Sequence, residues 1–363
     1  MTAERLFDNG ANEYEAVLIV SFGGPESRDD VAPFLDNVFR GLRVPDTARQ
    51  HIAKRYESFG GTSPINARTR ELIEALRHEF DCRGPALPIY WGNRNWHPLL
   101  PDTLQKMKAD GVRRSIAFVT SLFGSYSGCR QYREDLYDAV QGINDPPHVD
   151  KLRNGYNHPG FISAFTERVR DALAEIPEER RSAAQILFTA HSLPSAMARG
   201  ARYEAQLAEA AGLVALALAH PNWRLAFQSR NARYGPEEWL GPDLADALRE
   251  ARDQGTNDVV VSPLGFVSDH MEVILDLDIE AKRRADDLGL RMVRAGTVGT
   301  HPAFVEMIGD LVRERMVENP ARLALGRHGP SHDYCPSDCC LSGRSGQRRL
   351  ALCGVPPAAA PGP

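Results

Sequence analysis

The sequence contains no hydrophobic run long enough to span a membrane, since no stretch approaches the roughly 18 consecutive apolar residues of a membrane helix. The first 14 residues are polar and acidic and lack the apolar core of a secretory signal. An excess of positive charge is also absent. The formal net charge of -5 argues against broad affinity for nucleic acid, because phosphate binding needs a basic face. These absences predict a cytoplasmic protein with no stable membrane insertion and no nucleic-acid partner.

Two common catalytic signatures are missing as well. The glycine-rich segments 22–25 and 60–64 have neither the GxGxxG spacing nor the Lys-Ser/Thr ending that cradles phosphates, so they do not support nucleotide binding. No GxSxG motif surrounds the serines of 121–132, which makes a serine nucleophile the weaker interpretation of that segment. The chain has 42% hydrophobic and 25% charged residues over 363 positions, an ordinary globular composition that is sufficient for two domains.

Short apolar runs alternate with segments of helical periodicity in the first half of the chain. The runs are typical of buried strands, and the segments between them have the spacing of helices. Strands are expected at 15–21, 87–91 and 115–120, and helices at 30–40, 68–80 and 102–109. This alternation predicts an α/β fold with parallel sheet and right-handed crossovers.

The second half of the sequence repeats the order of the first. Segment 102–111 followed by SIAFVTSLF parallels 246–255 followed by DVVVSPLGF, and the strand before Phe22 parallels the strand before His191. WGNRN also matches FQSRN, and HPGF matches HPAF. Four matches in nearly the same order predict two similar Rossmann-like lobes with four-stranded parallel sheets and a cleft between them.

We therefore expect three regions along the chain. They are an amino-terminal α/β lobe at 1–150, a carboxyl-terminal α/β lobe at 151–325, and a largely irregular tail containing cysteines at 326–363. The first boundary is soft, because the final helix of each half can pack on the other lobe. Ligands of open parallel sheets bind beyond the carboxyl ends of strands, so the site is expected in the cleft.

His191 follows an apolar strand directly and precedes a turn. An imidazole at this place can reach the cleft with one nitrogen free, and it suits the role of proton acceptor near neutral pH. A turn histidine that bonds only to backbone explains the same position equally well.

Three carboxylates recur at every fourth residue of a predicted helix that begins near 271 and ends near 288. They are Glu272, Asp276 and Glu280. Like charges at this spacing destabilise a helix, so a compensating gain is expected. An acidic track suits divalent cations or proton relay, while a solvated helix face explains the pattern equally well.

Four of the six cysteines lie in the last 30 residues, namely Cys335, Cys339, Cys340 and Cys353. In a cytoplasmic chain, such clustering favours metal ligation over disulfides. A tail whose cysteines have no function is the alternative.

Together these segments resemble the ferrochelatase family over roughly residues 14–325. The motifs that carry the resemblance are SFGGP (21–25), GGTSPIN (60–66), GNRNWHP (92–98), SYSGCRQY (125–132), TAHSLP (189–194), FQSR (227–230), WLGP (239–242) and SDHMEVILDLDIE (268–280). The resemblance implies an enzyme of haem biosynthesis that inserts Fe²⁺, its substrate, into a porphyrin with release of two protons. His191 matches the family's proton acceptor and Glu272 its partner carboxylate. Asp276 and Glu280 match positions that conduct metal or protons, so these four residues form the implied metal set.

The resemblance also implies which residues contact the porphyrin. The residues expected to stack on the ring are Phe22, Tyr126 and Trp239. The residues expected to bind propionates through charge-assisted hydrogen bonds are Ser63, Arg94, Ser125 and Arg130. Some relatives carry Tyr where Phe22 stands; phenylalanine cannot ligate iron, so axial ligation from this side is not expected.

Some relatives hold a [2Fe–2S] cluster with one internal and three carboxyl-terminal cysteines. Cys129 matches the internal ligand, and Cys335, Cys339 and Cys340 are the expected tail ligands, which together supply the four thiolates that such a cluster needs. Cys339 and Cys340 are adjacent, an unusual spacing, so Cys353 is an alternative to one of them.

The segment 34–56 corresponds to the lip of the cleft, which is longer and apolar in membrane-bound relatives. Here it is short and charged. This favours the four-carboxylate substrate coproporphyrin III, converted to coproheme, over protoporphyrin IX. The same scaffold would also suit a chelatase for Co²⁺ or Ni²⁺, or a non-catalytic carrier of tetrapyrrole or metal. A monomer that delivers its product to a downstream enzyme of the haem pathway is expected.

Overall fold

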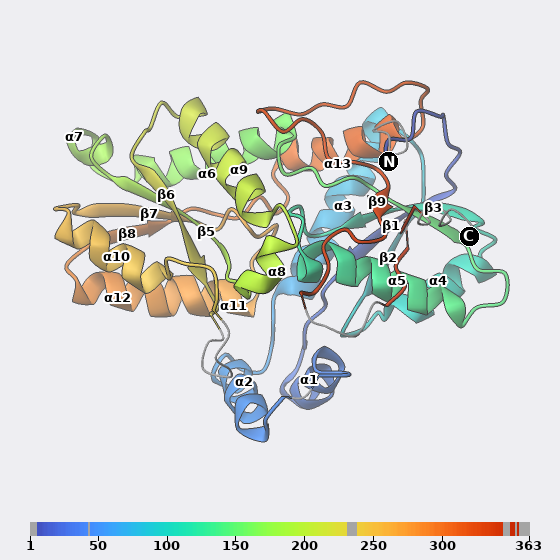
Figure 1. The fold of residues 1–363 in the computed structure, drawn as a ribbon, viewed down its shortest axis with the longest axis horizontal. Helices are drawn as coiled ribbons and strands as arrows, with labels where there is room; N and C mark the ends of the chain where they lie inside the picture. The colour runs from blue at the N-terminus through green and yellow to red at the C-terminus, as the bar shows by residue number, and fades with distance from the viewer. Residues whose placement is uncertain (1–5, 43, 231–237, 344–348, 353, 356–363) are drawn as a thin grey trace, which may run out of the picture.

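The computed structural model describes residues 6–42, 44–230, 238–343, 349–352 and 354–355. Two α/β lobes lie side by side, and a pair of helices, α1 (Val31–Val38) and α2 (Asp46–Ser58), projects from the junction between them (Figure 1). A short 3₁₀ turn (Arg28–Asp30) leads into α1. Among the described residues, no helix combines the length and the apolar character needed to cross a membrane.

The first lobe contains a parallel sheet with the strand order β2-β1-β3-β4. Its strands are β1 (Ala16–Ser21), β2 (Ile89–Asn93), β3 (Arg114–Val119) and β4 (His148–Lys151). Helices α4 (Leu100–Ala109) and α5 (Gln131–Gln141) cover one face, and α3 (Ile65–Arg83) covers the other. A π-helix, η3 (Tyr126–Arg130), precedes α5.

The second lobe repeats this arrangement with the order β6-β5-β7-β8. Its strands are β5 (Gln185–His191), β6 (Trp223–Gln228), β7 (Asp258–Ser262) and β8 (Arg291–Arg294). Its helices are α7 (Glu178–Arg181), α8 (Ser195–Arg199), α9 (Tyr203–Ala217), α10 (Leu244–Asp253), α11 (Met271–Val273) and α12 (Lys282–Asp287), with a second π-helix, η5 (Ile274–Ala281). The equal strand orders confirm the predicted pair of similar α/β lobes.

Strands of both sheets are buried on two faces, which explains why they read as continuous apolar runs. In β1, Val17 and Ile19 belong to a core shared by the two lobes, whereas Leu18 and Val20 pack under α4 and α5. Phe188 of β5 belongs to the same shared core. The lobes are therefore joined through apolar packing.

Two helices exchange partners between the lobes. Helix α6 (Pro159–Ala174) packs against α9, β7 and β8 of the second lobe, while α13 (Pro302–Glu314) packs against α3 of the first lobe and against α6. The division near residue 150 therefore separates the two sheets but not the helices that cover them, and the domain bounds remain a prediction.

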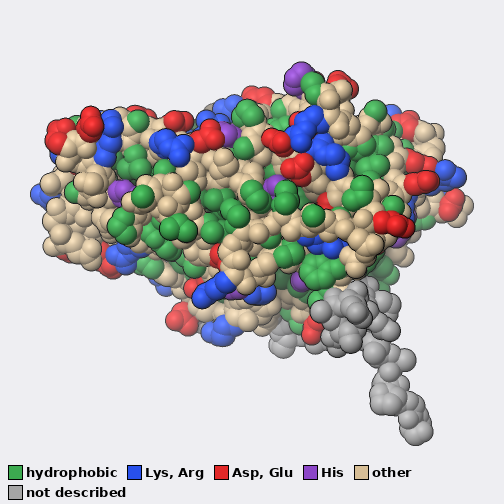
Figure 2. Space-filling view, turned by 90° about the horizontal axis from the view of Figure 1, so that it is seen from above, with side chains coloured by type: hydrophobic (Ala, Val, Ile, Leu, Met, Phe, Trp, Pro, Cys, Tyr) green, Lys and Arg blue, Asp and Glu red, His purple; other side chains and the backbone are tan. Residues whose placement is uncertain are grey.

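The segment after α13 returns to the first lobe (Figure 1). Strand β9 (Cys335–Pro336) forms a short parallel pair with β10 (Gly354–Val355). Asp333 is fully buried and accepts hydrogen bonds from Arg322 and from the amide of Asp8. Most of the described tail is irregular, but buried charges attach it to the body. Figure 2 shows acidic and basic side chains interspersed on one face of the molecule.

Candidate active site

His191 and Glu272 meet at the carboxyl ends of two neighbouring strands. His191 is the last residue of β5, and Glu272 lies in α11, just beyond the loop that follows β7. The distance between His191 Nε2 and Glu272 Oε2 is 3.8 Å, and the two side chains are 32% and 40% exposed. Parallel strands bring their carboxyl ends to one edge of a sheet, so the fold itself produces this pair.

The position of the imidazole protons follows from the other ring nitrogen. His191 Nδ1 lies 2.6 Å from the carbonyl oxygen of Ser192. A carbonyl can only accept, so we assign the Nδ1 hydrogen as the donor, which leaves Nε2 of the neutral ring unprotonated and facing Glu272. The turn is fixed by the hydroxyl of Ser192, which donates to the carbonyl of Leu240 (2.8 Å), and by Tyr203, which donates to the carbonyl of His191 (3.0 Å). The ring is therefore held with its proton-accepting nitrogen toward Glu272, in a side chain that is partly exposed.

The predicted helix after Met271 is present, but it is not a regular α-helix. Its central eight residues form the π-helix η5. π-Helices bond from i to i+5, so the expected α-helical stripe of carboxylates is wrong in its geometry. Asp276 is buried while the side chain of Glu280 is 55% exposed. π-Helices are rare and often occur at functional sites.

Asp276 has a cationic partner that its sequence neighbours do not supply. Arg55 of α2 forms an ion pair with Asp276, and its guanidinium lies 3.7 Å from Glu280. Ser229 also donates to Asp276. Burial lowers the pKa of Arg55, but the two carboxylates outweigh this effect and raise it. The repulsion expected along the acidic helix is therefore offset by a residue of the projecting helix pair.

Arg55, Asp276 and Glu280 line a cavity of about 380 Å³. Gln228, the last residue of β6, and Ser229 directly after it form another part of the cavity wall. Carboxylate, amide and hydroxyl oxygens are suitable ligands for hard divalent cations. The cavity therefore contains two of the four metal residues predicted from the sequence, His191 and Glu272 lying outside its lining.

Two aromatic residues near the pair were not predicted as site residues. Burial lowers the pKa of His270, the residue before α11, and its ring lies 5.3 Å from that of Phe266. Burial and the charge of Glu272 raise the pKa of Tyr56 in α2. The motif SDHME includes His270, but only the tertiary structure brings Tyr56 from the lip to this site.

Phe22 and Arg94 lie together directly beyond the carboxyl ends of strands β1 and β2 of the first lobe. Phe22 belongs to an apolar cluster with Phe34, and the two rings are 6.3 Å apart. The guanidinium of Arg94 lies 5.7 Å from the ring of Phe22 and 4.6 Å from that of Tyr132. It is paired with Asp135 and is only 7% exposed. Its charge is thus already partly neutralised.

The other predicted porphyrin contacts make bonds within the protein. Trp239 pairs with Pro194 beside the turn of His191. Ser63 accepts the amide of Met271 (3.4 Å), and Ser125 caps η3 by accepting the amide of Gly128 (2.9 Å). Tyr126, partly buried, donates to Glu134 (3.0 Å).

Arg130 is placed differently from the prediction. Its guanidinium is buried, bonds to Glu134 (2.8 Å) and donates to the carbonyls of Ser337 (2.7 Å) and Arg349 (3.0 Å). These contacts attach the tail to the first lobe and engage the buried guanidinium of Arg130 with partners inside the protein. We therefore do not retain it as a propionate contact.

The four cysteines predicted to act together do meet in one place. The side chain of Cys129 in η3 contacts that of Cys335, and the side chain of Cys335 also contacts that of Cys339. The sulfur atoms of Cys339 and Cys340 are 3.6 Å apart. His332 Nε2 lies 3.8 Å from Cys339 Sγ, and this histidine was not predicted. The donor atoms of His332, Cys335 and Cys339 all lie within 4.8 Å of one another.

These thiols line a cavity of about 460 Å³. The contact with Cys335, together with burial, raises the pKa of Cys129 in the absence of a metal. Metal ions displace such protons, and four neighbouring thiols, three of them buried and that of Cys339 partly buried, fit the ligand requirement of an iron–sulfur cluster. Cys353, the alternative ligand, lies outside the described residues.

Comparison with known proteins agrees with this geometry. The family model described as Ferrochelatase matches residues 14–316. A ferrochelatase of Rhodopirellula baltica is 51% identical, with 90% of this chain and 93% of the relative covered. A coproporphyrin III ferrochelatase of Streptomyces coelicolor is 45% identical, with 91% and 94% covered. The solved structure of SirB from Bacillus subtilis with Fe³⁺ covers 86% of this chain and 100% of its own, with a TM-score of 0.55 at 12% identity, which shows a common fold.

Proposed function

This chain belongs to the ferrochelatase family, and we propose that it inserts Fe²⁺ into coproporphyrin III to form coproheme, with release of two protons. The observation that carries the proposal is the 3.8 Å pair of His191 and Glu272, in which the accepting nitrogen of the imidazole faces the carboxylate. Relatives named coproporphyrin III ferrochelatase support the choice of substrate.

Iron insertion requires that two pyrrole N–H groups lose their protons as the nitrogens bond to the metal. His191 Nε2 accepts a proton, because Nδ1 is occupied by the carbonyl of Ser192. The carboxylate of Glu272 stabilises the resulting imidazolium and can pass protons to solvent, since it is two-fifths exposed. The pair thus performs proton removal, which is the part of the reaction that a protein side chain can supply.

Fe²⁺ is the second substrate, and we propose that it is handled by Asp276 and Glu280 together with the His191–Glu272 pair. Support comes from the cavity of about 380 Å³ that the two acidic residues line. Arg55 neutralises them in the absence of a cation. An incoming metal ion would take its place, so the buried carboxylate of Asp276 has a positive partner both before and after the cation binds.

The porphyrin is proposed to lie in the cleft against flat side chains. The proposed stacking residues are Phe22, Tyr126 and Trp239, and the proposed carboxylate contacts are Ser63, Arg94 and Ser125. Phe22 and Arg94 have the strongest support, because their side chains adjoin each other beside the lip.

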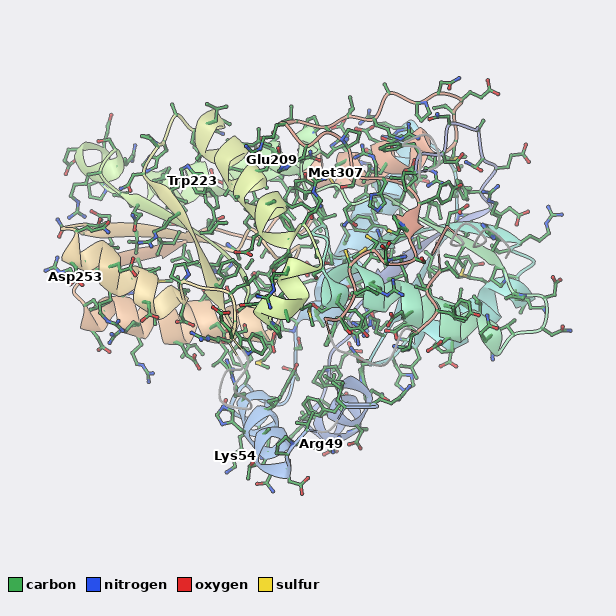
Figure 3. All side chains as sticks on the ribbon, in the orientation of Figure 1. Arg49, Lys54, Glu209, Trp223, Asp253 and Met307 are labelled. Carbon is green, nitrogen blue, oxygen red and sulfur yellow. The ribbon has the colours of Figure 1, made fainter. Side chains whose placement is uncertain are left out.

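The preference for coproporphyrin is proposed from the character of the lip. Figure 3 shows Arg49 and Lys54, which both belong to the projecting helix α2. Leu42 is the sole large apolar side chain exposed among the described residues of 34–56. A polar lip suits a substrate with four carboxylates better than one with two vinyl groups.

The test is a comparison of initial rates with coproporphyrin III and protoporphyrin IX, with anaerobic Fe²⁺ and the same enzyme preparation. We expect coproporphyrin to be metallated at least about tenfold faster at equal concentration. Equal rates would contradict the substrate choice, and no metallation of either porphyrin would contradict the activity.

We further propose that Cys129, Cys335, Cys339 and Cys340 hold a [2Fe–2S] cluster. Their common pocket supports this set, and His332 lies beside it. When bound, the cluster supplies one-electron chemistry and a covalent attachment of the tail to η3, and iron insertion does not require electron transfer from it. Analysis of anaerobically purified protein should find two iron and two sulfide per chain; protein without sulfide would contradict the cluster.

A further inference from the structure

Lys151 is a buried cation in the cavity of the four thiols. It is the last residue of β4, is 6% exposed, and lines the same cavity as Cys129 and Cys335. Its ammonium donates to the carbonyl of Leu152 (2.8 Å) and to Oδ1 of Asn154 (2.9 Å). Both acceptors are neutral, and in the part of the chain that the structure describes no carboxylate pairs with Lys151 within 4 Å.

A buried ammonium without an anion is costly, because hydrogen bonds to neutral acceptors replace only part of its hydration. The buried cation of Arg130, by contrast, is neutralised by a carboxylate, since Glu134 lies 2.8 Å from its guanidinium. Lys151 lacks such a partner among the described side chains. An anion in the adjoining cavity would supply it.

The second lobe has a cation at the position that is equivalent to Lys151. Arg294 is the last residue of β8, as Lys151 is of β4, and each faces the third strand of its sheet: Lys151 pairs with Ala117, and Arg294 with Val261. Arg294 donates to Asp269 (3.1 Å) and to Asp278 of π-helix η5 (2.8 Å). The cation at the end of the fourth strand is therefore neutralised by the segment after the third strand.

The corresponding π-helix of the first lobe, η3, has the sequence YSGCR and contains no acidic residue. Cys129 is its contribution to the cavity. Both lobes thus have a cation at this position, which adjoins thiols in the first lobe and carboxylates in the second. Thiolates bound to an iron–sulfur cluster carry a net negative charge, which carboxylates provide in the second lobe.

From this juxtaposition we propose that Lys151 is a counter-charge of the thiolate-bound cluster and raises its reduction potential. The inference rests on the cluster proposed above. Reduction adds one negative charge to the cluster, and a nearby cation in a buried site stabilises the reduced form more than the oxidised form. Lys151 is a tuning residue and takes no part in iron insertion.

The experiment compares Lys151→Met with the wild type and with the control Lys106→Met. Methionine keeps much of the volume of lysine and removes its charge. Lys106 is an exposed lysine on α4 that pairs with Asp110. For proteins of equal iron and sulfide content, the ratio of reduced to oxidised cluster is read by visible absorption at one fixed potential. We expect a fall of about tenfold in Lys151→Met, or about 59 mV for one electron, and no change in Lys106→Met.

A ratio within twofold of the wild type in Lys151→Met would overturn the inference. If that variant does not retain the cluster, Lys151→Arg is measured in its place. Wild-type contents of iron and sulfide and a wild-type ratio of reduced to oxidised cluster in Lys151→Arg support the inference. An arginine variant as deficient in iron and sulfide as the methionine variant overturns it. Failure of the cluster proposal is distinct, because the wild-type protein would then contain no sulfide.

Discussion

Arg55 of the projecting helix α2 forms an ion pair with Asp276 of the π-helix η5, which lies beyond the His191–Glu272 pair. This contact joins the lip of the cleft to the acidic cavity. Apolar packing supports it, since Phe34 and Tyr56 of the projecting helices share a cluster with Met271 and Leu275. The lip and the π-helix η5 therefore form one unit, and a change in either is expected to affect the other.

We predict that Arg55→Met increases the affinity of the cavity for divalent cations by about tenfold, because the guanidinium no longer competes for Asp276 and Glu280. Without metal, the variant should be less stable by about 1–3 kcal/mol, since Asp276 loses the partner of a partly buried pair. Calorimetric titration with Mn²⁺ measures the affinity. Arg49→Met is the matched control, because Arg49 lies on the same helix and pairs with Asp36 instead. Weaker Mn²⁺ binding in Arg55→Met would contradict the competing role of Arg55.

We predict that His191→Ala reduces anaerobic Fe²⁺ insertion by at least about 100-fold while porphyrin still binds, because the proton acceptor is lost and the cleft is kept. Rates follow from the absorption of the metallated product, and binding from quenching of porphyrin fluorescence. The exposed His78 on α3 provides the control His78→Ala. Near-normal turnover in His191→Ala would refute proton removal by this residue.

We predict that Glu272→Gln keeps the shape of the pair but lowers the insertion rate by about 10–100-fold. The neutral amide cannot stabilise the imidazolium that forms when His191 takes a proton. Steady-state kinetics should show the loss in kcat with little change in KM for the porphyrin. A loss confined to KM would assign Glu272 to substrate binding.

Gly265 allows the loop after β7 to pack on the strand that ends in His191. A Cβ at Gly265 would lie 2.6 Å from Cβ and 2.8 Å from Cα of Ala190. Gly265→Ala must therefore displace the end of β5, and we expect about tenfold lower activity and about 1–3 kcal/mol lower stability. In Gly212→Ala, the control in α9, the new Cβ makes only an ordinary 3.6 Å contact with Trp223. Unchanged kinetics in Gly265→Ala would show that the position of His191 tolerates this shift.

His158 is predicted to make stability depend on pH. It is buried at the start of α6, where Nδ1 accepts the amide of Gly160, and burial lowers its pKa from 6.5 to about 4. The unfolded chain binds a proton below pH 6.5 and the folded chain does not, so the contribution is fully present above pH 6.5 and is lost as the pH falls toward 4. Between pH 7 and pH 5 this amounts to about 2 kcal/mol. His158→Asn keeps a capping acceptor without titrating in this range.

Urea unfolding of both proteins at the two pH values measures this effect. The difference in unfolding free energy between pH 7 and pH 5 should be about 2 kcal/mol smaller in His158→Asn. An equal pH dependence in the two proteins would mean that His158 does not account for it.

The sequence determined the fold class, and it also predicted His191 and Glu272 as a candidate reacting pair. Apolar runs, helical periodicities and the repeated order of motifs are local patterns, and each lobe forms its own sheet, so these patterns were enough to predict two similar α/β lobes. Its place at the end of a buried strand predicted that His191 lies at the ligand-binding edge of the sheet, but only the family resemblance distinguished a proton acceptor from a turn histidine. The cysteines of the tail and Cys129 could be grouped only through the family resemblance, because more than 200 positions separate Cys129 from Cys335.

Only the tertiary structure decided how charges are matched. Arg55 and Asp276 are 221 positions apart, and Arg130 bonds to carbonyls more than 200 positions away, so no spacing in the sequence could reveal either contact. The π-helix likewise depends on packing, since the acidic spacing alone predicts a regular α-helix. Lys151 and Arg294 occupy the same place in the two lobes, yet one faces thiols and the other carboxylates. Periodicity specifies where each backbone element forms, whereas the partner of a buried charge depends on which distant segments the fold brings together.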